Sequence, residues 1–217
     1  MKDPAHESKL GLVVVGKNSE RDLKKNFPAT LVARFIDSLY VDSDSADSSL
    51  CVAENIGFRV IKIFGPAVSV STGRAVGTKY SEADHILYMD SDMELSEELI
   101  NSLIEVLNTN DELNCAGWVG DTIDRHPDGS IRKRRRKGRR GTAKSFGGFV
   151  LLKRAMVIAA GNWRVGLHAN EEIDLQSRIK KRGKFVKWSN QIEVSHFTNI
   201  KSPLHYAVNC YFPTSKN

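Results

Sequence analysis

The sequence predicts an α/β fold, a three-layer sandwich with a mostly parallel central sheet and helices on both faces. Its 217 residues suffice for one sizeable domain with a real core. The composition, 41% hydrophobic and 27% charged, is that of a globular protein. Short apolar runs alternate with segments of helical periodicity through the first half of the chain, and this order is typical of a parallel sheet covered on both faces.

The first half contains four runs that we interpret as strands, because strands buried on both faces are nearly continuous in hydrophobic residues. They cover residues 10–15, 35–41, 59–64 and 85–89. Helical segments alternate with these runs, and residues that stop helices, Pro28 and Gly57, follow the first two. The expected helices cover residues 20–27, 48–56, 71–83 and 97–107.

The second half is less regular. Strands are expected at 115–119, 146–152, 185–188 and 192–194, and helices at 154–160, 173–182 and 204–211. Residues 120–140 are polar and lack apolar periodicity, which predicts a long surface loop or a hairpin. No repeat or linker divides the chain, so we expect a single domain, 1–217, with a polar tail at 1–9 and two halves, 10–110 and 111–217.

The cellular location is inferred from the N-terminus and the cysteines. Residues 1–9 are polar and lack the apolar core of a secretory signal. No stretch approaches the roughly 20 apolar residues of a membrane helix. Cys51, Cys115 and Cys210 are too few and too far apart for a disulfide framework or a zinc site. We therefore expect reduced thiols in a cytoplasmic protein.

Two carboxylates, Asp90 and Asp92, follow the strand at 85–89 with only Ser91 between them. In open α/β sheets, ligands bind beyond the carboxyl ends of the strands. Hard cations such as Mg²⁺ and Mn²⁺ prefer oxygen ligands. The spacing therefore suggests a metal site that could hold a diphosphate. The alternative is an acidic start to the next helix, where negative charge suits the helix dipole.

Five segments, taken in order, resemble glycosyltransferase family 2, whose fold is of the GT-A type. They are residues 12–20, 40–48, 73–77, 90–92 and 171–178. The resemblance covers about residues 10–197. It implies an inverting, metal-dependent glycosyltransferase that uses a nucleotide sugar, which we expect to be UDP-linked. It also implies that residues 10–110 bind the nucleotide sugar and residues 111–217 the acceptor, in cell-envelope or polysaccharide biosynthesis.

The resemblance assigns donor binding to residues at the ends of the first strands and on the third helix. They are Asp42, Asp44, Arg74, Asp90, Ser91 and Asp92. Asp42 would bind the base, and Arg74 a phosphate or the base, since a guanidinium pairs with phosphate in bidentate geometry. A turn-forming aspartate and a solvated helix arginine are the alternatives. Asp90 and Asp92 would hold Mn²⁺ or Mg²⁺, with His196 completing the shell.

The catalytic base implied by the resemblance is Glu172, at a position where aspartate is commoner, with Glu171 as the second candidate. A carboxylate within hydrogen-bond reach can remove the proton of the acceptor hydroxyl. Both residues stand at the start of an expected helix, where a purely structural role is the alternative.

Acceptor binding is assigned by the resemblance to Gly147, Gly148, Trp163 and Arg178. The glycines would let sugar and backbone approach closely, and the aromatic face of Trp163 would stack on a sugar. Trp163 is equally suited to the core, and Arg178 could instead pair with Asp174 four residues earlier on the helix. The expected acceptor is a glycan or a lipid-linked sugar.

The net charge of +6 is local in origin. Arg132 to Arg140 holds eight basic residues, and the rest of the chain carries a net charge of −2. The run could be a solvated loop, a groove for an acidic acceptor, or a peripheral contact with the anionic inner face of a membrane. We expect no nucleic acid partner, because no aromatic residues are interleaved for base stacking.

Three other functions stay open at this point. A nucleotidyltransferase could use the same metal carboxylates. A sugar- or lipid-binding relative without turnover is compatible with Ala75 and Glu172, which depart from the family pattern. An RNA-binding protein could act through the basic run. Dehydrogenases and P-loop kinases are disfavoured, because neither glycine-rich signature is present.

Overall fold

The computed structural model describes residues 9–109 and 113–198. The strands are β1 (Leu10–Gly16), β2 (Asp37–Asp42), β3 (Arg59–Lys62), β4 (His85–Asp90), β5 (Cys115–Arg125), β6 (Ile131–Arg134), β7 (Phe149–Lys153) and β8 (Phe185–Phe197). The helices are α1 (Glu20–Asn26), α2 (Ala29–Val32), α3 (Ser49–Ile56), α4 (Val70–Tyr80), α5 (Glu97–Thr109), α6 (Arg154–Ala159) and α7 (Glu171–Lys181), and a 3-10 turn spans Arg139–Gly141.

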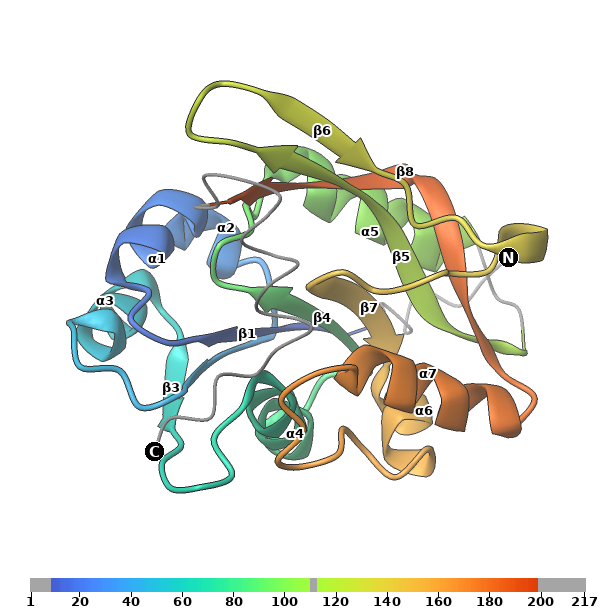
Figure 1. Cartoon of the computed structure of the whole chain (residues 1–217), viewed down its shortest axis with the longest axis horizontal. Coiled ribbons are helices and arrows are strands. Elements are labelled where there is room, and N and C mark those ends of the chain that lie inside the picture. Colours follow the sequence, from blue (N-terminus) through green and yellow to red (C-terminus); the bar gives the residue numbers. More distant parts are fainter. Residues whose placement is uncertain (1–8, 110–112, 199–217) are drawn as a thin grey trace, which may run out of the picture.

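These strands form one sheet in the order β3-β2-β1-β4-β7-β5-β6, with β8 beside β5. Strands β1 to β4 are mutually parallel, and β7 is antiparallel to β4. Helices α4, α6 and α7 lie on one face of the β1–β4 region, and α1, α3 and α5 lie on the other (Figure 1). The expected three-layer sandwich with a mostly parallel sheet is confirmed.

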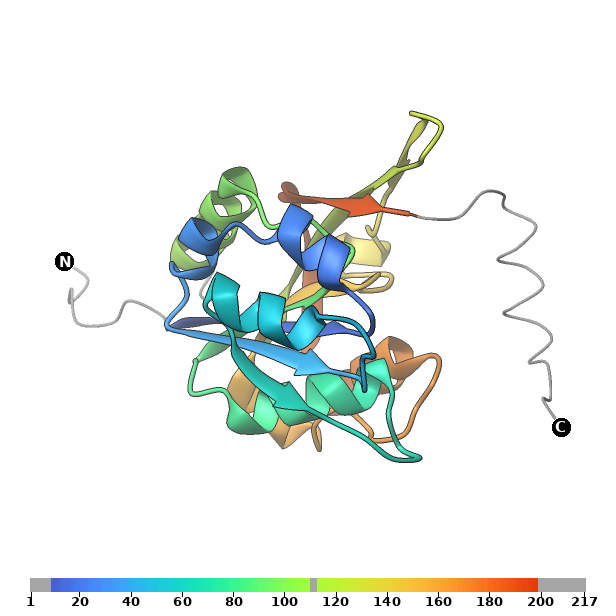
Figure 2. The ribbon, with the colours of Figure 1, turned by 90° about the vertical axis from the view of Figure 1, so that its left-hand side faces the viewer.

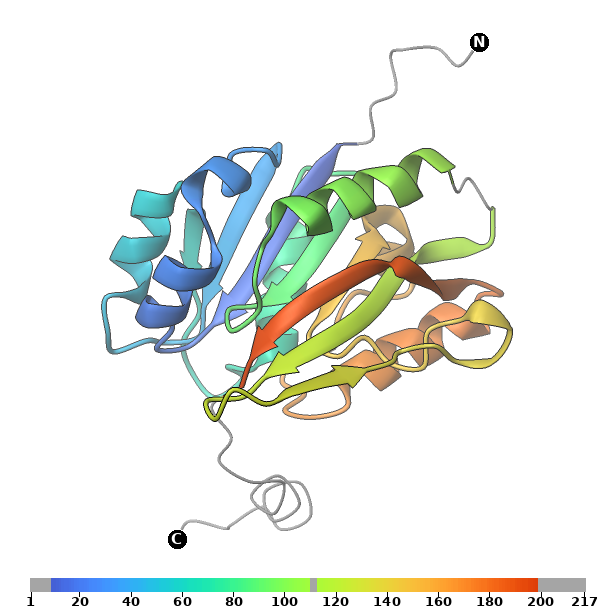
Figure 3. The same cartoon turned by 90° about the horizontal axis from the view of Figure 1, so that it is seen from above.

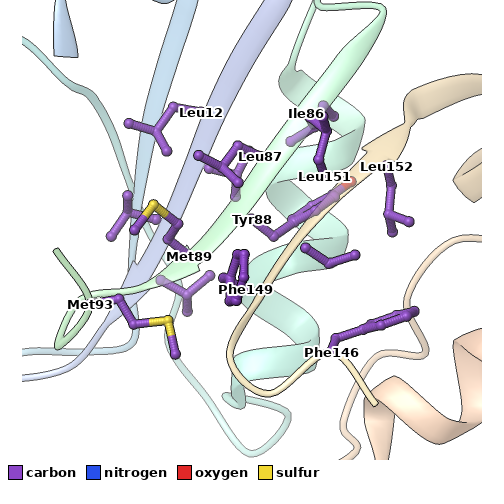
Figure 4. Packing of buried hydrophobic residues seen from close by; sticks show 14 of the residues in the cluster. Leu12, Ile86, Leu87, Tyr88, Met89, Met93, Phe146, Phe149, Leu151 and Leu152 are labelled. Atoms are coloured by element: carbon purple, nitrogen blue, oxygen red, sulfur yellow. The ribbon is translucent and has the colours of Figure 1, made fainter. Parts of the chain in front are cut away.

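Hydrophobic side chains from β1, β4 and β7 fill the space beside the central sheet (Figure 4). Helix α4 lies unusually close to β1. A Cβ atom at Gly73 would come within 2.6 Å of Val15 Cγ1, and one at Gly77 within 2.3 Å of Val13 Cγ1. Because only glycine permits this approach, the two residues fix the depth at which α4 carries Arg74 toward the carboxyl ends of the strands.

The second half differs from the expectation in its strands. The segment 120–140 is the hairpin alternative, since β5 extends to Arg125 and pairs antiparallel with β6. Strand β8 is one long strand beside β5, with two register shifts, rather than the two short strands expected. Figure 3 shows β8, β5 and β6 running side by side, and in Figure 2 the tip of the β5–β6 hairpin stands out from the body of the ribbon.

The shorter deviations have local causes. Strand β7 begins at Phe149 rather than at residue 146, because Gly147 and Gly148 both have positive φ. Helix α2 was not expected. It follows Pro28, whose carbonyl accepts the first turn's amides, and it delays the start of β2.

Part of the expectation concerns residues outside the described range. Those are residues 1–8 of the polar tail, Cys210 and the helix expected over 204–211. Within the described residues Cys51 is an exposed free thiol and Cys115 a buried one. None of the helices in residues 9–109 and 113–198 has the length and apolar character needed to cross a membrane.

Candidate functional site

The candidate site lies where the parallel strands β1, β2 and β4 end together. Gly16 pairs with Asp42, and Val15 with Asp90, so the last residues of three strands meet at one edge of the sheet. The carboxyl edge of such a sheet is where ligands bind. The loops and helices that follow these strands bring further polar residues to this edge.

Arg74 is the centre of a charge cluster at this edge. It is only 2% exposed, and it donates to Asp90 Oδ1 at 2.8 Å and to Glu171 Oε1 at 3.3 Å. Glu172 Oε1 lies 3.9 Å from the same guanidinium. Burial opposes the charge of Arg74, but the three carboxylates outweigh it and raise its pKa. Residues from α4, β4 and α7 are thus joined through one buried cation.

Asp90 has an unusual environment for an aspartate. Burial raises its pKa to about 6, and although Arg74 opposes the shift, the charges of Asp92 and Glu172 add to it. About a third of the side chain is still exposed. Asp90 is therefore an accessible carboxylate whose negative charge is costly in the free protein, and a cation bound beside it would relieve that cost.

Glu172 is bound by three consecutive backbone amides. Its Oε2 accepts from Phe146 N at 3.2 Å and Gly147 N at 2.9 Å, and its Oε1 accepts from Gly148 N at 2.9 Å. The amides converge because Gly147 and Gly148 have φ of 71° and 91°, a conformation that forms an anion-binding concavity. We call residues 146–148, with the Glu172 carboxylate in them, the glutamate nest.

The expected metal residues Asp92 and His196 are in direct contact. His196 Nε2 is 3.1 Å from Asp92 Oδ2, and its Nδ1 is 2.8 Å from Asp124 Oδ1. Burial opposes protonation of His196, but Asp92 and Asp124 outweigh it and raise the pKa. Among residues 9–109 and 113–198, no three ligating side chains already converge on one point. The adjacent carboxylate and imidazole suit Mn²⁺ if a diphosphate supplies further oxygens.

Three of the expected donor-binding residues have structural roles in this conformation. The Asp42 carboxylate is fully buried and accepts the Ser45 amide and hydroxyl, so it has the turn-forming role. Asp44 is exposed, with positive φ, and pairs with Lys62 at 3.1 Å. Ser91 is also buried and hydrogen-bonds Ser19, so its hydroxyl points away from solvent.

Two of the expected acceptor residues are occupied by protein. Trp163 is 2% exposed and packs edge-on against Tyr88 and Phe146, with the Arg74 guanidinium 5.0 Å from its ring centroid. It therefore supports the charge cluster from within the core and has no free face for a sugar. Arg178 pairs with Asp174 and also donates to the carbonyls of residues 160 and 162, which ties α7 to the turn that follows α6.

The basic run is largely engaged with protein. Lys133 pairs with Glu193, and Arg134 with Asp124. Arg136 donates its amide to Asp121 and lies against Gly147, where a Cβ would be 2.0 Å from the guanidinium carbon. Their partners Asp121 and Asp124 were not among the site residues predicted from the sequence. Two aspartates in an otherwise buried strand, facing a run of opposite charge, were the signal that could have identified them.

Known proteins share both sequence features and the fold with this chain. The model of the family described as Glycosyl transferase family 2 matches residues 13–169. Comparison with curated proteins gave no match.

Solved structures share the fold. GalNAc-T7, crystallised with UDP, GalNAc and Mn²⁺, superposes with a TM-score of 0.66 at 12% identity, over 89% of this chain and 44% of its own. The S. aureus protein TarS, residues 1–349, gives 0.65 at 16% identity, over 88% and 60%. A mycobacterial protein gives 0.62 at 15% identity, over 92% and 70%. The chain thus spans less than two thirds of the length of the first two.

Proposed function

The chain belongs to glycosyl transferase family 2 and has the GT-A fold, and from this premise we propose that it transfers a sugar, with inversion, from a UDP-linked donor to a hydroxyl acceptor. The observation that carries the proposal is the charge cluster at the carboxyl edge of the sheet. Arg74, Asp90 and the two glutamates of α7 come from distant parts of the sequence and meet where a nucleotide sugar would lie.

The donor would lie across the ends of β1, β2 and β4. Asp92 and His196, with Asp90 beside them, would hold Mn²⁺ or Mg²⁺ against the diphosphate. An ion there would neutralise the charge that develops on the leaving diphosphate. The UDP and Mn²⁺ in the GalNAc-T7 structure support this choice of donor and ion. Asp42 and Asp44 would come into contact with the nucleotide only if the 42–45 turn reorganises, so we assign the first contacts to Asp92 and to the partly exposed side chain of Asp90.

The acceptor hydroxyl would lose its proton to Glu172. A carboxylate has about four lone-pair directions, and the glutamate nest uses three of them, so one remains for the proton. As the proton moves to Glu172, the hydroxyl oxygen bonds to the anomeric carbon and the bond to the diphosphate breaks on the opposite face. Glu171, bound only by Arg74 among its described contacts, is the second candidate.

The acceptor would be a glycan or a lipid-linked sugar of the cell envelope, approaching past Gly147 and Gly148. Three residues of the basic run, Arg132, Arg139 and Arg140, are exposed and have no ion pair with the described residues. They are the residues through which we propose peripheral contact with an anionic membrane, in a cytoplasmic enzyme. Such contacts are screened by salt, because the Debye length is about 8 Å at physiological ionic strength.

Calorimetric titration with UDP, with and without Mn²⁺, tests the donor site. We expect wild-type protein to bind UDP more tightly with Mn²⁺, and Asp92→Ala to lose that difference. Asp128→Ala, at the tip of the β5–β6 hairpin, is the matched control and should behave as wild type. Metal-independent binding of equal strength in all three proteins would refute the metal assignment.

A further inference from the structure

A chain of side-chain contacts connects the β5–β6 hairpin, here called the basic hairpin, to Asp92, the proposed metal ligand after β4. Arg134 approaches both oxygens of Asp124, with Nη2 and Nε each 2.6 Å from one of them. Asp124 Oδ1 lies 2.8 Å from His196 Nδ1, and His196 Nε2 lies 3.1 Å from Asp92. The order Arg134, Asp124, His196, Asp92 runs from β6 through β5 and β8 to the turn that follows β4.

The backbone holds this chain of contacts in place. Asp124 and His196 are directly paired residues of the parallel strands β5 and β8. Beyond them, Phe197 N donates to Asp92 O at 2.9 Å, and Glu94 N donates to Ser195 O at 3.0 Å. The Asp124 side chain is 9% exposed and that of His196 19%. A well-packed ring with a partner at each nitrogen has a defined orientation.

We propose that Asp124 is a positioning residue for His196, and that the basic hairpin, through Arg134, belongs to the metal edge of the donor site. Asp124 and Asp92 each offer a carboxylate to one ring nitrogen, and the contact with Asp124 is the shorter, 2.8 Å against 3.1 Å. The neutral ring therefore places its proton on Nδ1, toward Asp124, and its Nε2 lone pair toward Asp92 and any divalent ion bound there. Second-sphere carboxylates fix the tautomer and the orientation of histidine ligands in this manner. The inference rests on the metal part of the proposed function.

One contact competes with this assignment. Arg134 Nη2 lies 3.2 Å from His196 Nδ1, and an arginine can only donate. If Nδ1 accepted from Arg134, the proton would sit on Nε2 and the lone pair would face away from the metal edge. The Asp124 contact is the shorter by 0.4 Å and involves a carboxylate, which can only accept when ionised. The geometry therefore favours Nδ1–H.

Asp124→Asn separates the two arrangements. Asparagine has a single oxygen, and Arg134, with the closest contacts to Asp124, would take it. The amide NH₂ would then face Nδ1 and favour the Nε2–H tautomer, which cannot ligate through Nε2. Asp121→Asn is the matched control, because Asp121 is also a buried aspartate of β5 that binds the basic hairpin, yet it contacts Trp188 and Arg136 instead of His196.

Two measurements test the inference. Long-range ¹H–¹⁵N correlation in the metal-free protein, at a pH high enough to keep the ring neutral, reports the tautomer of His196. Electron paramagnetic resonance reports free Mn²⁺ during titration with and without UDP. We expect Nδ1–H in wild type and in Asp121→Asn, and Nε2–H in Asp124→Asn. We also expect Asp124→Asn to bind Mn²⁺ roughly 10- to 100-fold more weakly than the control.

The outcomes are distinguishable. An Nε2–H tautomer in wild type overturns the inference. Because this measurement is made on the wild-type protein, it does not depend on whether a variant folds. Equal Mn²⁺ affinity of Asp124→Asn and Asp121→Asn also overturns it, while the proposed function stands. A wild-type protein that binds no Mn²⁺, with or without UDP, removes the metal from the proposed function, and the positioning role falls with it.

Discussion

The glutamate nest is expected to make Glu172 a determinant of stability as well as a candidate base. Glu172→Gln preserves the shape of the side chain but leaves one oxygen for three amides. In its better orientation glutamine keeps the bonds from Phe146 and Gly147 and sets its NH₂ group against the Gly148 amide, 2.9 Å from the present oxygen. The variant therefore loses the hydrogen bond from Gly148 and replaces two charge-assisted hydrogen bonds by weaker neutral ones. It also sets two hydrogen-bond donors, the side-chain NH₂ and the Gly148 amide, against each other.

The magnitude follows from these changes. A hydrogen bond to a charged group contributes about 1.5–3 kcal/mol and a neutral one about 0.5–1.5 kcal/mol, and an unsatisfied donor costs about 1–3 kcal/mol. The Glu172 side chain is 18% exposed, so water offsets part of the loss. We expect Glu172→Gln to lower the free energy of unfolding by about 2–4 kcal/mol, and the melting temperature by roughly 5–15 °C.

Urea and thermal unfolding measure this effect, and Glu171→Gln is the matched control. Glu171 accepts only from Arg74 at 3.3 Å among its described contacts, and Asp90 remains the closer partner of Arg74 at 2.8 Å. The control should lose about 1 kcal/mol or less. Equal unfolding free energies for the two variants would refute the claim that the nest holds Glu172. Loss of transfer in Glu172→Gln identifies a base only when the folded fraction is known.

Three further predictions concern other parts of the molecule. Burial, reinforced by Lys153, lowers the pKa of His85 to about 4 from 6.5, so the unfolded chain binds more protons between those pH values and stability falls as the pH drops from 6.5 to 4. We expect His85→Gln to reduce that fall by about 1–2 kcal/mol, allowing for the partial exposure of the ring, in urea unfolding at pH 7 and pH 4.5; parallel curves would contradict this. In Gly148→Ala the new Cβ would be 2.4 Å from Met93 Cε and 2.8 Å from Asp90 Oδ2, whereas Gly57 has positive φ but open space around it. Gly148→Ala should therefore lower the free energy of unfolding by about 1–3 kcal/mol more than Gly57→Ala. Equal losses would show that the loop moves to accommodate the methyl group. Replacing Arg132, Arg139 and Arg140 by Ser should weaken sedimentation with anionic vesicles at low salt more than replacing the exposed Lys180, Lys181 and Arg182, and identical sedimentation would count against a membrane role for the basic run.

The layered fold and the edge that carries the site could be predicted because each depends on local patterns. Continuous apolar runs identified β1 and β4, and the Asp90-Ser91-Asp92 segment begins at the last residue of β4. The parallel arrangement then places Asp90 beside the ends of β1 and β2. Sequence order alone was sufficient for this part of the site.

Contacts between distant residues could not be predicted in the same way. The partners Arg74 and Glu171 are 97 positions apart, and Asp124 and His196 are 72 apart. The role of Glu172 depends on the backbone of two glycines, whose positive φ values turn three amides toward one point. Trp163 illustrates a further difficulty. A tryptophan that stacks on a sugar and a tryptophan buried in the core are the same residue in the sequence, and they differ only in whether the ring face is open to solvent.

The most direct test of the account measures what the protein releases from nucleotide sugars. Purified protein is incubated with Mn²⁺, a panel of nucleotide sugars and a panel of glycan and lipid-linked acceptors, and the released nucleotide and phosphate species are separated and quantified. Transfer of the sugar predicts nucleoside diphosphate in amounts equal to the glycosylated acceptor, with the UDP-linked donors active. Release of pyrophosphate would assign the same carboxylates to nucleotidyl transfer, and binding of donors without release of either product, across the panel, would contradict catalysis.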